Sequence, residues 1–466
     1  MRFFIARHSS PSCWDPLALR GGLAMEHGSM HHFRYVQGRL NAENVDLETL
    51  AEKHGTPLYV YSKATIEDHF TRLDSAMNRV DHLVCYAVKA NSNLAVLNTI
   101  ANLGGGFDIV SGGELFRVLK AGGQAANCTF AGVGKTRDEI EYALKAGIYC
   151  FNAESEAEVR YIDKVAGELG KIAPIALRVN PNVDAKTHAK ITTGKSENKF
   201  GIDFDRVLDA YAAIAKDCPN LEIKGLQMHI GSQLTSVDPF VEAVKKVVPL
   251  VQEVKARHGL KFFSIGGGIG IVYKQSLDSG DSGWWAEQGT DAPLSVQTYA
   301  DAISPHLETL GLRILLEPGR FMVGNAGVLL TRVLYEKKGN AKTFKIVDAG
   351  MNDLIRPTLY EGWHQIVPTQ KPNSDVLEKA DIVGPICETG DFLAQDREMA
   401  PVKEGDLLAV MSAGAYGFTM ASNYNTRPLA AEVMVHGAKA SLVRSRQTLE
   451  DIIRGESLLA DAKETA

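Results

Sequence analysis

The chain from residue 83 to 91 reads LVCYAVKAN, an apolar run that ends in a lysine and an asparagine. The chain from residue 223 to 233 has the same plan, IKGLQMHIGSQ, with a histidine, a glycine and a serine near its end. Such runs favour buried β-strands, and the polar residues favour the turns that follow them. Eight runs of this kind lie between residues 60 and 320: Leu83–Val88, Gly106–Val110, Cys128–Val133, Ile148–Asn152, Ile175–Asn180, Ile223–Ile230, Phe262–Ile265 and Ile314–Leu316.

Amphipathic patterns between these runs predict helices, for example over Ala64–Val80, Gly113–Ala121, Arg137–Lys145, Glu154–Leu169, Phe204–Lys216 and Pro239–Arg257. Eight strands that alternate with helices predict a parallel (β/α)8 barrel of the TIM type. An open, doubly wound parallel sheet is the alternative, and it would collect ligand groups at one switch point. Here nearly every run ends in polar residues, which favours the barrel.

The chain is long enough for two domains, since it has 466 residues, 45% of them apolar. After residue 320, short β-like segments follow one another without long helices, which predicts a C-terminal β-rich domain in an α/β protein. The predicted parts are a disordered extension or targeting peptide at 1–30, an N-terminal segment joining the β domain at 31–60, the barrel at 61–320, the β domain at 321–455 and a tail at 456–466.

Composition argues against several classes of protein. A net charge of −6 without a basic block argues against nucleic-acid binding. No apolar stretch is long enough to span a bilayer, so no membrane partner is expected. The six cysteines are scattered and form no C-x-x-C pair, which gives no metal motif and is typical of a reducing compartment. We therefore expect a cytoplasmic protein.

The ends of the predicted strands carry the residues capable of chemistry. In a barrel, all carboxyl ends of the strands open on one face, and active sites lie on that face. Residues more than 200 positions apart can therefore meet in one pocket. The strand ends in question are Lys89-Ala90-Asn91, Phe107-Asp108, Arg178-Val179-Asn180, His229-Ile230-Gly231-Ser232-Gln233, Gly266-Gly267-Gly268-Ile269-Gly270 and Glu317-Pro318-Gly319-Arg320.

These residue types together suggest pyridoxal phosphate. A glycine run lets backbone N–H groups approach a phosphate, although a tight turn explains it equally well, and the Ser232 hydroxyl could contribute. Lys89 could link to an aldehyde, although solvated strand-end lysines are commoner. Glu317 could pair with a protonated pyridine nitrogen and His229 could stack on the ring. Taken singly, Glu317 is equally a salt-bridge partner and His229 a structural histidine.

Five motifs in order resemble the pyridoxal-phosphate-dependent decarboxylases of the alanine-racemase-like fold, over residues 33–445. The motifs are Tyr86–Asn91, His229–Gln233, Gly266–Gly268, Glu317–Arg320 and Cys387-Glu388-Thr389-Gly390-Asp391. The resemblance implies that Lys89 binds the cofactor and moves protons, His229 stacks on the ring and Glu317 binds the pyridine nitrogen. It further implies that the phosphate is held by Ser232, Gly267, Gly268, Gly319, Arg320 and Tyr416, and that Asp108 and Arg178 support the cofactor.

The resemblance also implies a homodimer, in which Cys387 and Glu388 of one subunit complete the site of the other. Thr389 stands where the family often has serine, a change that keeps the hydroxyl. The proton donor to the product carbon is left open between Lys89 and Cys387. The implied reaction is decarboxylation of an amino acid.

Substrate choice depends on residues that could bind the far end of an amino acid. Arginines favour a distal carboxylate, and the candidate substrate-binding residues are Arg320, Arg356, Tyr360, Glu388 and Tyr416. A domain-interface salt bridge is the alternative for Arg356. The predicted substrate has an amino-acid group at each end. Alternatives are decarboxylation of ornithine, arginine or lysine, a non-catalytic pyridoxal-phosphate carrier, and a barrel aldolase.

Overall fold

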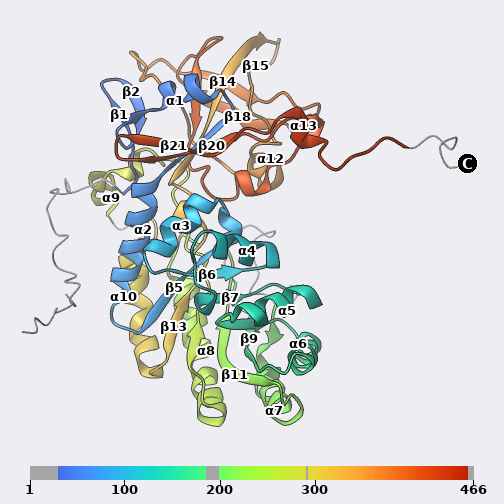
Figure 1. Cartoon of the computed structure of the whole chain (residues 1–466). Helices are drawn as coiled ribbons and strands as arrows, with labels where there is room; N and C mark the ends of the chain where they lie inside the picture. The colour runs from blue at the N-terminus through green and yellow to red at the C-terminus, as the bar shows by residue number, and fades with distance from the viewer. Residues whose placement is uncertain (1–29, 185–198, 290–291, 460–466) are drawn as a thin grey trace, which may run out of the picture.

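The computed structural model describes residues 30–184, 199–289 and 292–459. The predictions for residues 1–29 and 460–466 lie outside these ranges. The described chain forms a barrel, in the lower half of Figure 1, and a β-rich part above it. Among the described residues, no helix combines the length and the apolar character needed to cross a membrane.

Eight parallel strands of the described chain close into a barrel, because β8 pairs with both β7 and β9. The predicted (β/α)8 barrel is therefore confirmed, and the open sheet is excluded. The strand interiors are almost wholly buried, as expected for a sheet covered on both faces. The barrel strands are β5 (His82–Ala87), β6 (Gly106–Ile109), β7 (Cys128–Phe130), β8 (Cys150–Ala153), β9 (Ala173–Asn180), β11 (Leu221–Met228), β12 (Phe262–Ser264) and β13 (Arg313–Leu316).

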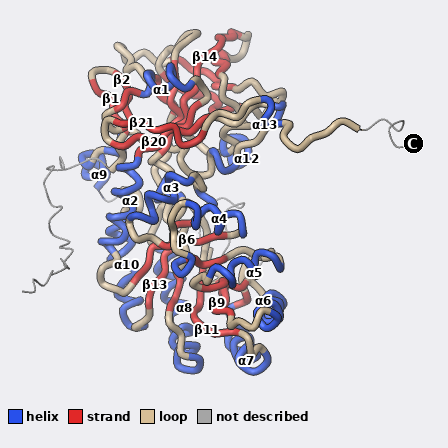
Figure 2. The backbone as a smooth tube through the Cα atoms, viewed as in Figure 1, coloured by secondary structure: helices blue, strands red, loops and turns tan. Residues whose placement is uncertain are grey.

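Helices surround the barrel strands, as the blue tube in Figure 2 shows. Helix α5 illustrates why these segments are helical: Thr136 and Glu139 form a capping box, and Gly147 ends the helix in the left-handed conformation. Its buried side chains repeat at helical spacing and face the strands. The surrounding helices are α2 (Lys63–Ala76), α3 (Leu94–Asn102), α4 (Gly112–Lys120), α5 (Arg137–Ala146), α6 (Glu156–Glu168), α7 (Val207–Asp217), α8 (Asp238–His258) and α10 (Val296–Leu307).

The β-rich part is a mixed sheet built around the long strand β14. Strand β4 (Leu58–Ser62) lies at its centre, antiparallel to β14 and parallel to β20. The expected boundary between residues 60 and 61 falls inside β4, so the barrel part begins with α2. The other strands are β14 (Gly327–Lys338), β15 (Thr343–Val347), β16 (Ile366–Pro368), β17 (Glu378–Val383), β18 (Phe392–Met399), β19 (Leu407–Val410), β20 (Ala431–His436) and β21 (Lys439–Arg444).

Smaller elements complete the described chain. A three-stranded sheet precedes β4 and is hydrogen-bonded to the β-rich part through Leu40 and Thr369. Its strands are β1 (Phe33–Val36), β2 (Arg39–Ala42) and β3 (Val45–Asp46), and the short elements elsewhere are α1 (Leu47–His54), β10 (Ile202–Asp203), α9 (Ser282–Gln288), α11 (Arg320–Val323), α12 (Arg356–Tyr360) and α13 (Leu449–Ile452).

Candidate active site

Lys89 lies in a short turn directly after β5, at the carboxyl end of the barrel. Its Nζ donates a hydrogen bond of 2.9 Å to Oδ2 of Asp108, which lies on the neighbouring strand β6. Desolvation lowers the pKa of Lys89, but the negative charge of Asp108 outweighs it, and the net shift of the pKa is upward. Because 43% of the Lys89 side chain is exposed, the amine remains accessible to a ligand.

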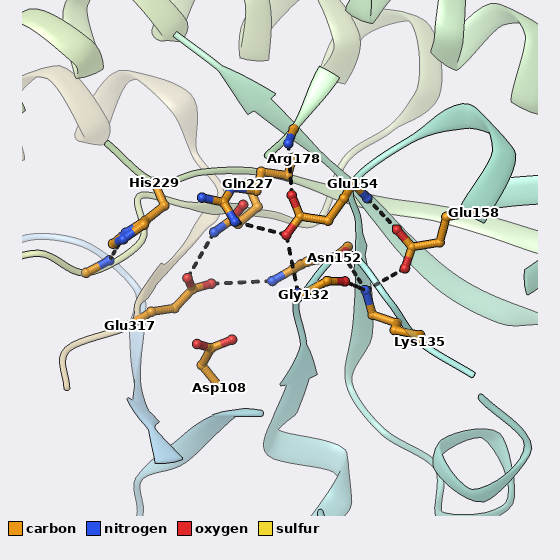
Figure 3. Close-up of polar contacts among 12 residues, drawn as sticks. Asp108, Gly132, Lys135, Asn152, Glu154, Glu158, Arg178, Gln227, His229 and Glu317 are labelled. Carbon is orange, nitrogen blue, oxygen red and sulfur yellow. Dashed lines mark hydrogen bonds and ion pairs between the residues drawn. The ribbon is translucent and has the colours of Figure 1, made fainter. Parts of the chain in front are cut away.

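Glu317 follows β13 and accepts hydrogen bonds from neutral donors on three other strands, two of which, Asn152 and Gln227, are drawn in Figure 3. The Ser264 hydroxyl donates to its Oε1 over 2.6 Å, and the Gln227 amide donates to its Oε2 over 3.0 Å. Asn152 adds a longer bond of 3.4 Å to Oε1. Burial, and then the charge of Asp108, raises the pKa of Glu317 to about 7, against the opposing effect of these donors. The carboxyl group is thus fixed in orientation, and it gains or loses its proton near neutral pH.

His229 lies directly after β11 with its ring fixed by the glycine run. The backbone N–H of Gly267 donates to its Nδ1 over 3.2 Å, so the neutral ring carries its proton on Nε2. Burial lowers the pKa of His229 well below its usual value, and the positive charges of Arg178 and Lys89 lower it further. A neutral, oriented imidazole is suited to stacking against a ligand ring.

The glycine run allows three loops to pack together. A Cβ on Gly267 would stand 2.1 Å from the carbonyl oxygen of Glu317, and one on Gly268 would stand 2.5 Å from that of Gly231. Gly268 also has a φ of +109°, which side chains rarely adopt. Only glycine therefore lets the ends of β11, β12 and β13 lie against one another here.

Arg178 lies in the buried C-terminal half of β9 and forms an ion pair with Glu154. Its Nη1 donates to Oε1 of Glu154 over 2.9 Å, and its guanidinium lies 4.7 Å from the centre of the Phe200 ring. Its Nη2 is buried and has no hydrogen-bond partner among the described residues. Glu154 also accepts from the backbone N–H groups of Gly132 and Gly201, so the pair is rigidly placed.

Arg320, at the start of α11, connects the two halves of the site. Its Nη2 donates to the Ser232 hydroxyl over 3.3 Å and its Nη1 to the Tyr273 hydroxyl over 2.6 Å. Its guanidinium also lies 4.8 Å from the ring centre of Tyr416, whose backbone N–H bonds to the carbonyl of Ala90, beside Lys89. The predicted phosphate residues thus form one continuous cluster with the loop that carries Lys89. Gly319 belongs to it, since a Cβ there would stand 3.5 Å from the Tyr416 hydroxyl.

A cavity of about 590 Å³ opens beside Arg320. Its lining includes the cations Arg320, Arg356 and Lys274, together with Tyr360, and none of the described residues that line it is a carboxylate. Arg320 and Arg356 are each only 7% exposed, and neither forms an ion pair with a carboxylate in the part of the chain described here. The salt bridge considered for Arg356 is therefore not observed there. Buried cations without a counter-ion favour binding of an anion.

Cys387 and Glu388 lie away from this cavity. Both are exposed; the backbone N–H of Cys387 bonds to Asn425, and Glu388 accepts a hydrogen bond from Tyr424. Neither is among the residues that line the cavity. The two residues are thus on the surface of the single chain.

Three donors around Glu317 are not among the site residues predicted from the sequence: Asn152, Gln227 and Ser264. A signal for Gln227 was present, because it lies two positions before His229 on one strand, and such residues face the same side. Ser264 likewise precedes the glycine run by two positions. Asn152 is the last residue of a predicted strand, and an asparagine at that position is equally typical of a turn, so no signal marked it as a site residue.

The residues present fit pyridoxal phosphate. Besides Nη2 of Arg178, three oxygen atoms near the ends of barrel strands are buried and have no hydrogen-bond partner in the described part of the chain: Asp108 Oδ1, Asn152 Oδ1 and Gln227 Oε1. Figure 3 shows the carboxyl group of Asp108 pointing toward Glu317, whose own carboxyl oxygens face Gln227 and Asn152. An accessible amine, a pair of carboxylates for a ring nitrogen and a glycine cradle beside Ser232 and Arg320 match the aldehyde, pyridine and phosphate of this cofactor.

Comparisons with known proteins agree with this chemistry. Residues 63–324, more than half of the chain, match the family described as "Pyridoxal-dependent decarboxylase, pyridoxal binding domain". The diaminopimelate decarboxylases of Vibrio cholerae and Pseudomonas aeruginosa are each 50% identical to the chain, covering 93% and 92% of it and 100% of their own length. The crystal structure of diaminopimelate decarboxylase from Helicobacter pylori complexed with L-lysine is 41% identical, with a TM-score of 0.81 over 88% of this chain and 98% of that one.

Proposed function

Because the chain belongs to the pyridoxal-dependent decarboxylases, and among them to the diaminopimelate decarboxylases, we propose that it converts meso-2,6-diaminopimelate to L-lysine and CO2. The observation that supports this substrate is the cavity with two buried arginines, where no carboxylate occurs among the described lining residues. Diaminopimelate brings a second carboxylate to that cavity. When ornithine, arginine or lysine joins the cofactor through its α-amine, no carboxylate remains at the distal end, so these substrates would leave Arg356 without a counter-ion.

The cofactor is pyridoxal phosphate, which when bound supplies an aldehyde that links to amines and an electron-poor ring that accepts the electron pair left by departing CO2. Lys89 binds it through Nζ and exchanges a proton there, with Asp108 as the adjacent acceptor. Glu317, held by Gln227 and Ser264, keeps the ring nitrogen protonated. His229 packs against the ring face and excludes water.

Arg356 and Arg320 hold the distal carboxylate, and Tyr360 and Tyr416 complete the wall of the substrate site. Holding both ends fixes the carbon that loses CO2 over the ring, which lowers the entropic part of the barrier. The bond from that carbon to the carboxylate breaks, the electron pair stays on the carbon, and a proton from Lys89 or Cys387 replaces the CO2.

The exposed loop of Cys387 and Glu388 supports a homodimer, because these residues reach no substrate atom within their own subunit's cavity. In the dimer, Cys387 of the second copy contributes a thiol and Glu388 binds the distal ammonium group. Four buried free thiols among the described residues support a reducing, cytoplasmic location.

The test is a visible absorbance scan of the purified protein, followed by CO2 release from meso-diaminopimelate, ornithine, arginine and lysine. The bound cofactor should give a visible band, and diaminopimelate should be the preferred substrate. A colourless protein would support the barrel aldolase, and a coloured protein with no CO2 release would support the carrier. Faster turnover of a substrate without a distal carboxylate would contradict the proposal.

A further inference from the structure

We propose that Tyr273 and His364 are positioning residues that hold the guanidinium of Arg356 from two sides, in the orientation that binds the distal carboxylate of the substrate. This inference rests on the proposed function, and it concerns residues that bind neither cofactor nor substrate in that proposal. Both side chains contact Arg356 directly in the structure.

Tyr273 places its ring against Arg356 and its hydroxyl against Arg320. The Arg356 guanidinium lies 4.4 Å from the centre of the Tyr273 ring, a stacking distance for a planar cation on an aromatic face. The same side chain accepts a hydrogen bond of 2.6 Å from Nη1 of Arg320. One tyrosine thus separates the two like charges and fixes each of them.

His364 fixes Arg356 from another side. Its Nδ1 lies 2.8 Å from the carbonyl oxygen of Met411, and a carbonyl only accepts, so Nδ1 carries the proton. Nε2 is then a bare acceptor, and Nη1 of Arg356 donates to it over 2.6 Å. Burial, and then the charge of Arg356, lowers the pKa of His364 well below its usual value, which keeps this tautomer neutral.

The histidine is itself held in place. It is fully buried, its ring packs edge-on to that of Tyr273 at 5.2 Å, and its backbone carbonyl accepts a hydrogen bond from Arg397. A guanidinium has five N–H groups, so after one bond to His364 the others remain for a carboxylate. Tyr273 comes from the loop after β12, whereas Arg356 and His364 come from the β-rich part. The orientation therefore depends on the packing of the two parts.

The test compares two ligands of the holoenzyme that differ by one carboxylate. L-lysine is the proposed product, so its one carboxylate is the distal carboxylate that diaminopimelate keeps after CO2 has left. 1,5-Diaminopentane has no carboxylate. Calorimetry gives Kd for both ligands, and steady-state kinetics give KM and kcat for diaminopimelate. The variants are Tyr273→Leu and His364→Phe, each paired with a conservative variant: Tyr273→Phe keeps the stacked ring, and His364→Gln can keep an acceptor near the position of Nε2.

We expect Tyr273→Leu and His364→Phe to weaken L-lysine binding about tenfold or more and to raise KM by a similar factor. Binding of 1,5-diaminopentane, kcat and the visible absorbance of the cofactor should change less than about threefold. The conservative variants should recover most of the L-lysine affinity. Tyr211→Phe is the control: it removes buried hydrogen bonds to Leu177 and Gly225, so it should lower Tm without changing either Kd.

Unchanged L-lysine binding in both disruptive variants would overturn the inference, as would equal weakening of both ligands. Failure of the conservative variants to recover affinity would likewise overturn it, since a purely structural role predicts that result. If wild-type enzyme releases no CO2 from diaminopimelate, the proposed function itself fails. Failure of the proposed function can be distinguished from failure of the inference about Tyr273 and His364, because it is measured on the wild-type enzyme alone.

Discussion

The carbonyl oxygen of Glu317 lies 2.1 Å from the point where a Cβ on Gly267 would stand. These residues end adjacent strands, and no side chain can be inserted between them without moving one strand end. The same backbone carries the N–H that orients His229 and the carboxylate proposed to bind the ring nitrogen. The glycine thus sets the relative position of two cofactor-binding groups.

Gly267→Ala should therefore displace the turn and weaken cofactor binding. A clash with backbone cannot be relieved by a side-chain rotation, so we expect a loss of about 2 kcal/mol or more in stability and a lower cofactor content. Thermal unfolding and the ratio of visible to ultraviolet absorbance measure the two effects. Gly134→Ala is a suitable control, because a Cβ there meets nothing within 4 Å. Equal behaviour of the two variants would remove Gly267 from the site.

Lys89→Ala should remove the visible absorbance of the lysine-linked cofactor and abolish CO2 release, because no other amine is placed beside Asp108 in the described structure. Absorbance spectra after reconstitution with pyridoxal phosphate provide the measurement. The exposed Lys245 on α8 offers a matched control, and Lys245→Ala should keep both signals. A surviving band in the Lys89 variant would contradict the assignment.

Glu317 should make the cofactor-free protein less stable as pH rises. Its folded-state pKa is about 7 against an ordinary 4.5. Between these pH values the unfolded chain has released its proton and the folded chain has kept it, so the free energy of unfolding falls as pH rises and levels off above pH 7. Glu317→Gln removes this effect, and its stability relative to wild type should rise by about 2 to 3 kcal/mol from pH 5 to pH 8.

Urea denaturation at the two pH values measures the Glu317 effect. An unfavourable contact between the new amide and Gln227 would change the free energy of unfolding equally at both pH values, so it cancels when the two values are subtracted. The exposed Glu398 provides the control variant Glu398→Gln. A pH-independent difference between Glu317→Gln and wild type would show that Glu317 does not carry the proton in this range.

Arg356→Ala should raise KM for diaminopimelate by about 30- to 100-fold, since a buried charge-assisted bond to carboxylate is lost. Cofactor affinity should stay unchanged, because the contacts of Arg356 run to Tyr273 and His364. Lys274→Ala is the matched control: its cation is at the exposed rim of the same cavity, where water screens it, and the effect should be below about threefold. An unchanged KM in the Arg356 variant would remove this arginine from the substrate site.

Mixed dimers test the shared active site. Lys89→Ala and Cys387→Ala should each be nearly inactive alone. After subunit exchange, half of the dimers combine the two variants, and each of these has one intact site, so activity should reach about a quarter of wild type. CO2 release after mixing, with exchange confirmed by a mass tag, is the measurement. No recovery after confirmed exchange would contradict a shared site.

Much of the architecture could be predicted from the sequence, because the signals for strands and helices are local patterns of apolar and polar residues. Strand runs such as Ile223–Ile230 end in polar residues at the same face, and helical spacing between them leaves few topologies for eight strands. The candidate residues Lys89, His229 and Glu317 were found for the same reason: each stands directly after a predicted strand. Strand β4 was not predicted, because a short apolar run before a helix is compatible both with the first element of the barrel and with a strand of the β-rich part.

Contacts between particular side chains follow from the tertiary structure and could not be read from the sequence. The three donors around Glu317 come from different strands. Tyr273 comes from a loop of the barrel part, whereas Arg356 on α12 and His364 in the loop after it belong to the β-rich part. Periodicity specifies the face on which a residue lies, but a hydrogen bond requires a placement within a few tenths of an ångström. That placement follows from the register and closure of the barrel and from its packing against the β-rich part, which are properties of the whole chain.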